Sequence, residues 1–197
     1  MVTKAFRDAG CAVVGLDRSS GADLSTAAGA KAAVEKAVAE LGGLDVVLHL
    51  VGGFALGTLA ETGDDVWEKM MTLNFRSALF TIRAALPALR ANGWGHVVVI
   101  GSPMGAEPRA GLAAYAVSKA ALHALVRSAA DELAGTGITV NAILPNTIDT
   151  EANRKAMPDA DTKRWVKPER MASLMLWMAS EEGRDMTGAL VGLNGEA

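Results

Sequence analysis

The chain has 197 residues, half of them hydrophobic and 21% charged, with a formal net charge of −3. That length can bury one substantial core and is too short to favour two, so we predict a single domain spanning residues 1–197. The weak negative charge argues against a nucleic-acid partner and favours a small-molecule one.

The cysteine and histidine residues indicate whether the protein has disulfides or a metal site. The single cysteine, Cys11, can form no internal disulfide and no thiolate metal site, which fits a reducing compartment. The histidines His49, His96 and His123 are scattered without ligand spacing, so we expect no metal. The start of the chain lacks a signal-peptide pattern, and no apolar run approaches the ~20 residues that cross a bilayer. We therefore predict a cytoplasmic protein.

The first part of the chain alternates helical and strand patterns. Residues 3–9 are typical of the end of a helix that Gly10 closes, and the apolar run 11–16 predicts a short buried strand ending at Asp17. Residues 27–41 predict an amphipathic helix, with apolar residues on one face and lysines and glutamates on the other.

The same alternation continues to the end of the chain. Residues 44–51 are nearly all apolar, as in a strand covered on both faces. Thr62 and Asp65 resemble a capping box that opens a helix reaching Leu86, and Pro87 should kink or end it. The remaining patterns predict strands at 96–101, 138–143 and 188–193 and helices at 113–134 and 168–180.

Strands that alternate with helices indicate βαβ units. We predict a Rossmann-type, doubly wound α/β fold with a mostly parallel sheet and helices on both faces. In such folds, ligands bind beyond the carboxyl ends of the strands. Functional side chains are therefore expected just after strands and on the helices that follow them.

Four polar residues occupy such positions: Asn74, Ser102, Tyr115 and Lys119. Tyr115 and Lys119 are four apart on a predicted helix and share one face. An ammonium near a phenol lowers the phenol's pKa, which suits acid/base work. Ser102 follows a strand and can help the phenol polarise a substrate carbonyl. Asn74 interrupts an apolar helix face, and we expect its amide to bind a water shared with Lys119.

The motifs YAVSK (115–119), GS ending at Ser102, LNFRS around Asn74 and VNAILPNTIDT (140–150) resemble those of the short-chain dehydrogenase/reductase family. The resemblance covers nearly the whole chain and implies an NAD(P)-dependent oxidoreductase acting on a carbonyl or alcohol. It implies Tyr115 as the acid/base, Lys119 also binding the nicotinamide ribose, Ser102 orienting substrate and Asn74 anchoring a relay water.

The resemblance also implies cofactor-binding positions. Asp17 would bind the adenosine ribose and repel a 2′-phosphate, favouring NAD, although Arg18 beside it could grip that phosphate of NADP. Asp23 and Leu24 resemble the pair that packs against adenine, with a plain turn aspartate as the alternative.

Two further places correspond to cofactor contacts in that family. Gly52 and Gly53 let the backbone approach the cofactor, although the family's usual asparagines are absent there. Ile148 and Thr150 match positions that meet the nicotinamide carboxamide and a phosphate. Asn146 stands where a glycine is usual and tolerates a left-handed turn.

The family's opening strand and glycine-rich phosphate turn are not found before residues 3–9. That strand would lie between 11–16 and 44–51, so we expect a strained or rearranged sheet, and either a product that starts upstream or a truncated form with poor cofactor affinity.

Residues 143–165 most resemble the quinoid dihydropteridine reductase branch, although those enzymes typically lack the serine at position 102. A general carbonyl or alcohol substrate is at least as compatible. A third possibility is a non-catalytic relative kept for assembly. The helices at 66–90 and 113–134 pair across subunits in the family, which implies a homodimer or homotetramer.

Overall fold

The computed structural model describes residues 1–195, so residues 196–197 of the predicted domain lie outside the described residues. Its centre is a parallel sheet in the order β1-β2-β3-β4. The strands are β1 (Val46–His49), β2 (Gly95–Ile100), β3 (Ile138–Pro145) and β4 (Leu190–Leu193). The predicted doubly wound α/β fold is confirmed, and the predicted runs 44–51, 96–101, 138–143 and 188–193 each overlap one of these strands.

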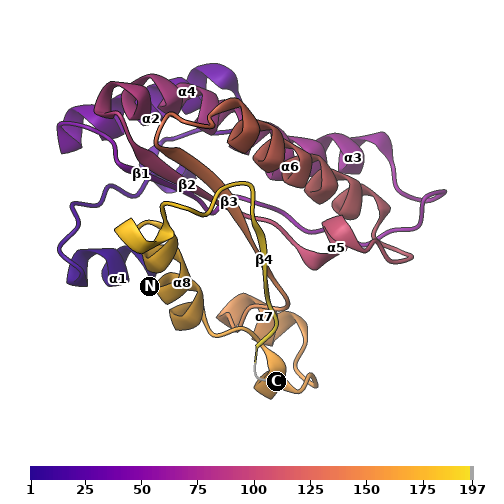
Figure 1. Cartoon of the computed structure of the whole chain (residues 1–197). Coiled ribbons are helices and arrows are strands. Elements are labelled where there is room, and N and C mark those ends of the chain that lie inside the picture. The colour runs from indigo at the N-terminus through magenta and orange to yellow at the C-terminus, as the bar shows by residue number, and fades with distance from the viewer. Residues whose placement is uncertain (196–197) are drawn as a thin grey trace.

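Helices cover both faces of the sheet (Figure 1). The α-helices of the described residues are α1 (Val2–Asp8), α2 (Ala27–Leu41), α3 (Asp64–Met71), α4 (Ser77–Asn92), α5 (Pro103–Ala106), α6 (Ala113–Glu132), α7 (Glu151–Ala156) and α8 (Pro168–Met178). Shorter turns are Arg18–Ser20, Thr162–Arg164 and Glu181–Gly183, and a π-helical segment, Thr72–Arg76, joins α3 to α4. In Figure 1, α2, α4 and α6 lie on one side of the sheet and α1 and α8 on the other.

Two apolar clusters follow from the alternation of side chains along the strands. Val97 and Val99 of β2 belong to the cluster under α2, α4 and α6, while Val98 between them belongs to the cluster with α1 and α8. All three valines are fully buried. A strand buried on both faces explains why β2 is a continuous apolar run rather than an alternating one.

The predicted strand at 11–16 is wrong. Those residues belong to no ladder, and all of them are exposed or only partly buried. A strand needs a neighbour that accepts and donates its backbone hydrogen bonds, and β1 is the edge of the sheet within residues 1–195. Two bonds anchor the segment instead, from Cys11 N to Phe6 O (3.0 Å) and from the Arg7 side chain to Val13 O (3.2 Å).

The helix predicted from Thr62 to Leu86 differs at both ends. It begins at Asp64 with Gly63 as its N-cap, because the Thr62 hydroxyl donates to Thr58 O (2.6 Å) and makes no capping box. Pro87 does not end it, since α4 runs on to Asn92. Proline removes one helical hydrogen bond here, and burial of apolar residues on either side of Pro87 keeps the helix intact.

Candidate active site

Tyr115 and Lys119 lie one turn apart on α6, as their spacing predicts. Lys119 is 4% exposed, and its Nζ donates to Ile100 O (2.7 Å) at the carboxyl end of β2. The same Nζ lies 6.0 Å from the centroid of the Tyr115 ring. Burial lowers the pKa of Lys119 to about 8. The Ile100 carbonyl thus holds the Lys119 ammonium over the face of the Tyr115 ring.

Ser102 stands at the start of the loop that follows β2. Its Oγ accepts a hydrogen bond from Met104 N (3.2 Å), which caps α5, and its side chain also hydrogen-bonds to Tyr115. Gly101 N donates to Ile143 O (2.8 Å), so this loop leaves the same edge of the sheet as the end of β3. Ser102, Tyr115 and Lys119 therefore converge at the carboxyl ends of the strands.

The expectation that Lys119 lowers the pKa of Tyr115 is not met. Burial raises the pKa of the phenol, and the hydrogen bond with Ser102 only partly offsets that rise. The reason is geometric, because the ammonium lies over the ring and is bonded to Ile100 rather than to the phenol oxygen. Tyr115 is consequently a protonated phenol at neutral pH.

Asn74 lies in the π-helical segment between α3 and α4 and is 1% exposed. Its Oδ1 accepts from Gly53 N (2.8 Å), while Nδ2 donates to Gly53 O (3.0 Å) and to Ser118 Oγ (2.9 Å). Ser118 Oγ donates in turn to Tyr115 O (2.7 Å). Asn74 therefore ties the loop after β1 to the helix that carries Tyr115.

The close packing of the loop after β1 against Asn74, Lys119 and Leu73 explains why glycine occupies positions 52 and 53. A β-carbon on Gly52 would lie 3.0 Å from Asn74 Oδ1 and 3.4 Å from Lys119 Nζ. A β-carbon on Gly53 would lie 2.9 Å from Leu73 Cδ1. Glycine at both positions lets the loop backbone approach the cluster closely.

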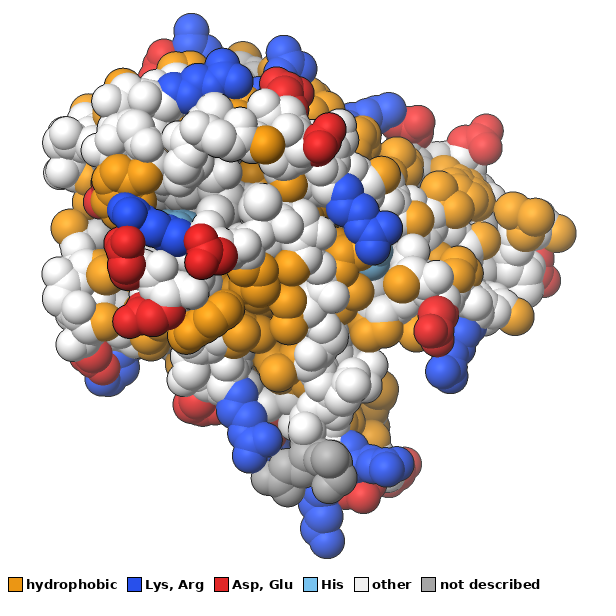
Figure 2. Space-filling view, viewed as in Figure 1, with side chains coloured by type: hydrophobic (Ala, Val, Ile, Leu, Met, Phe, Trp, Pro, Cys, Tyr) orange, Lys and Arg blue, Asp and Glu red, His pale blue; other side chains and the backbone are white. Residues whose placement is uncertain are grey.

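Sequence reasoning missed Phe54, whose ring meets the Tyr115 ring edge-on with centroids 5.0 Å apart. Phe54 is 61% exposed, and Leu56 and Leu59 further along the loop are 74% and 73% exposed. Figure 2 shows hydrophobic side chains gathered at the end of the molecule where this loop protrudes in Figure 1. An aromatic residue directly after the Gly-Gly pair in the loop that follows β1 is the signal that could have found it.

Two histidines, interpreted as structural, flank the cluster. His49 Nε2 lies 3.0 Å from Ser77 Oγ, and burial, helped by the charge of Lys119, lowers the pKa of His49 to about 4. His123 Nε2 accepts a long bond from Ser102 N (3.4 Å), and burial lowers its pKa to about 4 as well. Both rings are therefore neutral at pH 7.

These histidines predict acid sensitivity. The folded pKa of His49 lies below the ordinary value of 6.5, so the unfolded chain binds more protons between these values, and stability is lost as pH falls through that window. We expect His49 alone to lower the free energy of unfolding by about 2 kcal/mol from pH 7 to pH 5. Urea unfolding of the parent chain and of His49→Asn at both pH values measures this, and equal pH slopes for the two proteins would contradict it.

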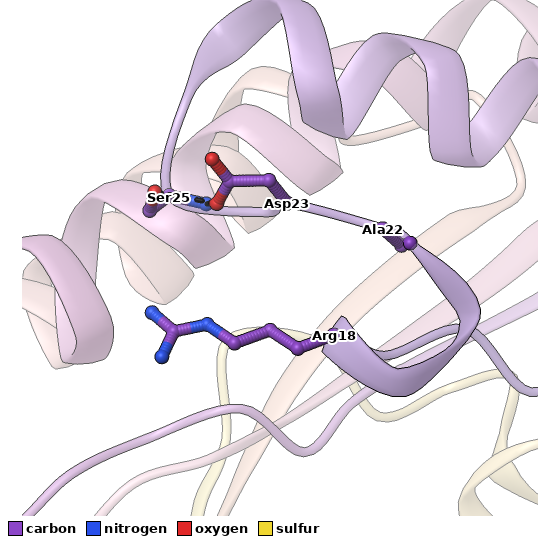
Figure 3. Close-up of a pocket in the computed structure, with 5 residues that line it drawn as sticks. Arg18, Ala22, Asp23 and Ser25 are labelled. Atoms are coloured by element: carbon purple, nitrogen blue, oxygen red, sulfur yellow. Dashed lines mark hydrogen bonds between the residues drawn. The ribbon is translucent and has the colours of Figure 1, made fainter.

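The residues expected on the adenosine side lie in the exposed turn after residue 16. The Asp17 carboxylate accepts from Ser19 Oγ (2.5 Å) and Ser20 N (3.1 Å), and Asp17 has a lowered pKa, first because of the Ser19 bond. A pocket of about 310 Å³ lies beside this turn, lined by Arg18, Gly21, Ala22, Asp23 and Ser25. Figure 3 shows the Arg18 side chain extended below Asp23 across this pocket.

Asp23 is also engaged locally, since its Oδ1 accepts from Ser25 N (3.0 Å) and Ser25 Oγ (2.5 Å). Leu24 beside it is partly buried. Both aspartates therefore make local turn bonds, which was the alternative for Asp23, while keeping their carboxylates at the surface. On the other side of the site, Ile148 pairs with Val166, and Thr150 Oγ1 accepts from Asn153 N (3.2 Å) to cap α7.

Residues 1–195 hold neither a metal-binding cluster nor a helix that could span a membrane. No three histidine, cysteine, aspartate or glutamate side chains gather as a metal site there. No helix in the same range has the length and apolar character needed to span a membrane.

Comparison with known proteins places the chain in a family. Residues 2–195 match the family described as enoyl-(acyl carrier protein) reductase. The chain is 37% identical over 193 residues to the rhamnolipids biosynthesis 3-oxoacyl-(acyl-carrier-protein) reductase of Pseudomonas aeruginosa, covering 88% of this chain and 74% of that protein. It is 26% identical over 195 residues to a D-beta-hydroxybutyrate dehydrogenase of Cupriavidus necator, covering 89% and 76%. It is 29% identical over 173 residues to a 3-oxoacyl-(acyl-carrier-protein) reductase of Thermotoga maritima, covering 84% and 70%.

The chain belongs to the short-chain dehydrogenase/reductase family and is an oxidoreductase of that class. Enzymes of this family use NAD or NADP and act on small molecules. The resemblance seen in the four motifs is thus confirmed.

Proposed function

We propose that this oxidoreductase transfers a hydride between a nicotinamide dinucleotide and a carbonyl or alcohol, with Tyr115 as the acid/base. One observation carries the proposal. The only tyrosine of the chain shares a hydrogen bond with Ser102 and lies over the buried ammonium of Lys119, at the carboxyl ends of the strands. Ligands bind at that edge in doubly wound folds.

The surrounding residues fit a dinucleotide. A lysine ammonium has three N–H donors, and Ile100 O takes one of them, which leaves donors for the ribose hydroxyls of the nicotinamide half. At the other end, the pocket beside Arg18 and Asp23 offers both charged and small residues to the adenosine half. Between these two places, Gly52 and Gly53 let the protein backbone approach the cofactor closely.

When bound, a nicotinamide cofactor would supply a hydride to the carbonyl carbon of the substrate. Tyr115 then gives its proton to the carbonyl oxygen, and the Ser102 hydroxyl donates a hydrogen bond to the same oxygen. Burial keeps the Tyr115 pKa raised, so the phenol enters the reaction protonated, as reduction requires. The Lys119 ammonium, held by Ile100 O and 6.0 Å from the ring centroid, is placed to bind the nicotinamide ribose.

We propose a 3-oxoacyl or 3-hydroxyacyl compound as substrate. The relatives named as 3-oxoacyl reductases and as a hydroxybutyrate dehydrogenase share an oxygen at carbon 3 of an acyl group. The exposed Phe54 ring beside Tyr115 supports an apolar substrate portion near the reacting carbon.

We propose NAD as the cofactor, with NADP as the alternative. Asp17 and Asp23 place two carboxylates beside the one guanidinium of Arg18, so that end of the site has a net negative charge. A 2′-phosphate would add further negative charge there and be repelled.

The test is oxidation of NADH and of NADPH with a 3-oxobutyryl thioester and, separately, with a quinonoid dihydropterin. We expect turnover of the thioester and a lower KM for NADH than for NADPH. Turnover of the pterin alone would favour the dihydropteridine reductase alternative. Cofactor binding by calorimetry without turnover of any carbonyl compound would favour a non-catalytic relative.

We also propose a homo-oligomer paired through α4 and α6, the surfaces that the family uses.

A further inference from the structure

Between β3 and α8 the chain makes an excursion whose two ends are joined by backbone hydrogen bonds. We call the joined ends, residues 147–149 and Val166, the neck. Val166 N donates to Thr147 O (2.8 Å), and Asp149 N donates to Val166 O (2.9 Å). Between these residues lie α7 and the turn Thr162–Arg164, and Figure 1 shows α7 projecting away from the body of the protein. Residues 150–165 therefore form a projecting segment whose two ends are held together.

Asp149 lies in this neck with its side chain 9% exposed. Arg154 of α7 grips it with two bonds, Nε to Oδ1 (2.6 Å) and Nη2 to Oδ2 (2.9 Å). Lys167, the N-cap of α8, donates from Nζ to Oδ2 (2.6 Å). A two-pronged arginine contact fixes orientation as well as distance. One carboxylate thus joins the end of β3, α7 and the start of α8.

The residues on either side of Asp149 are fixed through the same helix. Asn153 of α7 donates from Nδ2 to Ile148 O (2.8 Å) and from its backbone N to Thr150 Oγ1 (3.2 Å). Arg154 is the next residue after Asn153 on α7, so its two hydrogen bonds to Asp149 also fix the position of Asn153. Hydrogen bonds from Arg154 and Lys167 hold the pKa of Asp149 far below its ordinary value, so the carboxylate stays ionised at neutral pH.

We propose that Asp149 is a positioning residue that holds Ile148 and Thr150 ready to receive the nicotinamide half of the cofactor. This inference rests on the proposed function and on the family resemblance, which implies that Ile148 and Thr150 meet the nicotinamide half. A neck that is already ordered loses less conformational freedom when the ligand binds, and so gains affinity.

The test compares two ligands by calorimetry on the full chain and on Asp149→Asn. NADH carries both halves of the cofactor, whereas AMP carries only the adenosine half. We expect the substitution to raise the Kd for NADH about tenfold and to leave the Kd for AMP unchanged. Arg154→Gln, which keeps the Lys167 bond, should give a smaller rise.

A second measurement needs no cofactor. Residues 150–165 contain trypsin sites at Arg154, Lys155, Lys163 and Arg164. Cleavage there should be several-fold faster in Asp149→Asn than in the parent chain, because the neck has lost its central partner. Glu181→Gln breaks the exposed pair with Arg184 and is the matched control, expected to change neither cleavage nor binding.

Equal NADH affinity in the parent chain and Asp149→Asn would overturn the inference. Equal weakening of NADH and AMP would do so too, because it would show a general loss of structure. A parent chain that binds AMP but gains nothing from the nicotinamide half would count against the proposed function itself. In that event the cleavage rates still decide whether Asp149 orders residues 150–165.

Discussion

Replacing Tyr115 with phenylalanine is expected to lower kcat by about 10²–10⁴-fold, the range typical of losing a general acid/base. The substitution removes only the hydroxyl that hydrogen-bonds with Ser102 and keeps the ring that packs edge-on against Phe54. The free energy of unfolding should therefore change by less than about 1 kcal/mol. Steady-state turnover and urea unfolding measured on the same preparation separate the two effects.

Thr136→Ala is a suitable control for loss of a hydroxyl. Thr136 Oγ1 donates to Leu133 O (2.6 Å) in the loop between α6 and β3, at the opposite end of the sheet from Tyr115. Its turnover should match that of the parent chain. If Tyr115→Phe kept more than about a tenth of the parent kcat, the assignment of the acid/base would be wrong.

Replacing Asn74 with alanine is expected to destabilise the fold by about 2–4 kcal/mol. The amide is buried and binds both polar groups of the Gly53 backbone together with Ser118 Oγ. Without it, the Gly53 N–H and C=O lose their partners beside the loop that approaches Lys119. Urea unfolding at pH 7 gives the change in free energy, and turnover should fall as well because the loop loses its anchor.

Asn92→Ala provides the comparison for this variant. Asn92 is exposed and makes one bond, from Nδ2 to Asp45 Oδ1 (2.7 Å). Its loss should cost less than about 1 kcal/mol. Similar destabilisation by the two alanine substitutions would mean that the Asn74 bonds contribute no more than surface contacts do.

Sequence reasoning located the parallel strands because each is an apolar run with a helix on either side, a pattern that depends on nearby residues. The run at 11–16 has the same composition but no partner strand beside it, and pairing depends on residues far away in the chain. Pro87 does not end its helix for a similar reason, since core packing outweighs one lost helical bond. The π-helical segment around Asn74 carries no local signal.

The candidate site divides in the same way. The spacing of Tyr115 and Lys119 on one helix, and the position of Ser102 after a strand, are features of local order, and the structure brings the three together. The direction of the Tyr115 pKa shift could not be predicted, because it depends on how deeply the phenol is buried and on where the Lys119 ammonium points. The contacts of His49 and Phe54 likewise depend on residues brought near by folding.

The position of β1 at the margin of the sheet bears on how the protein moves. In a parallel sheet, successive backbone amides of a strand point to alternate sides, so every second amide of β1 faces away from β2. Those amides lack a ladder partner within residues 1–195 and should exchange their protons for solvent deuterons quickly, whereas β2, between two strands, is protected along its length. Because β1 ends at His49, these fast-exchanging amides lie next to the loop that Asn74 holds.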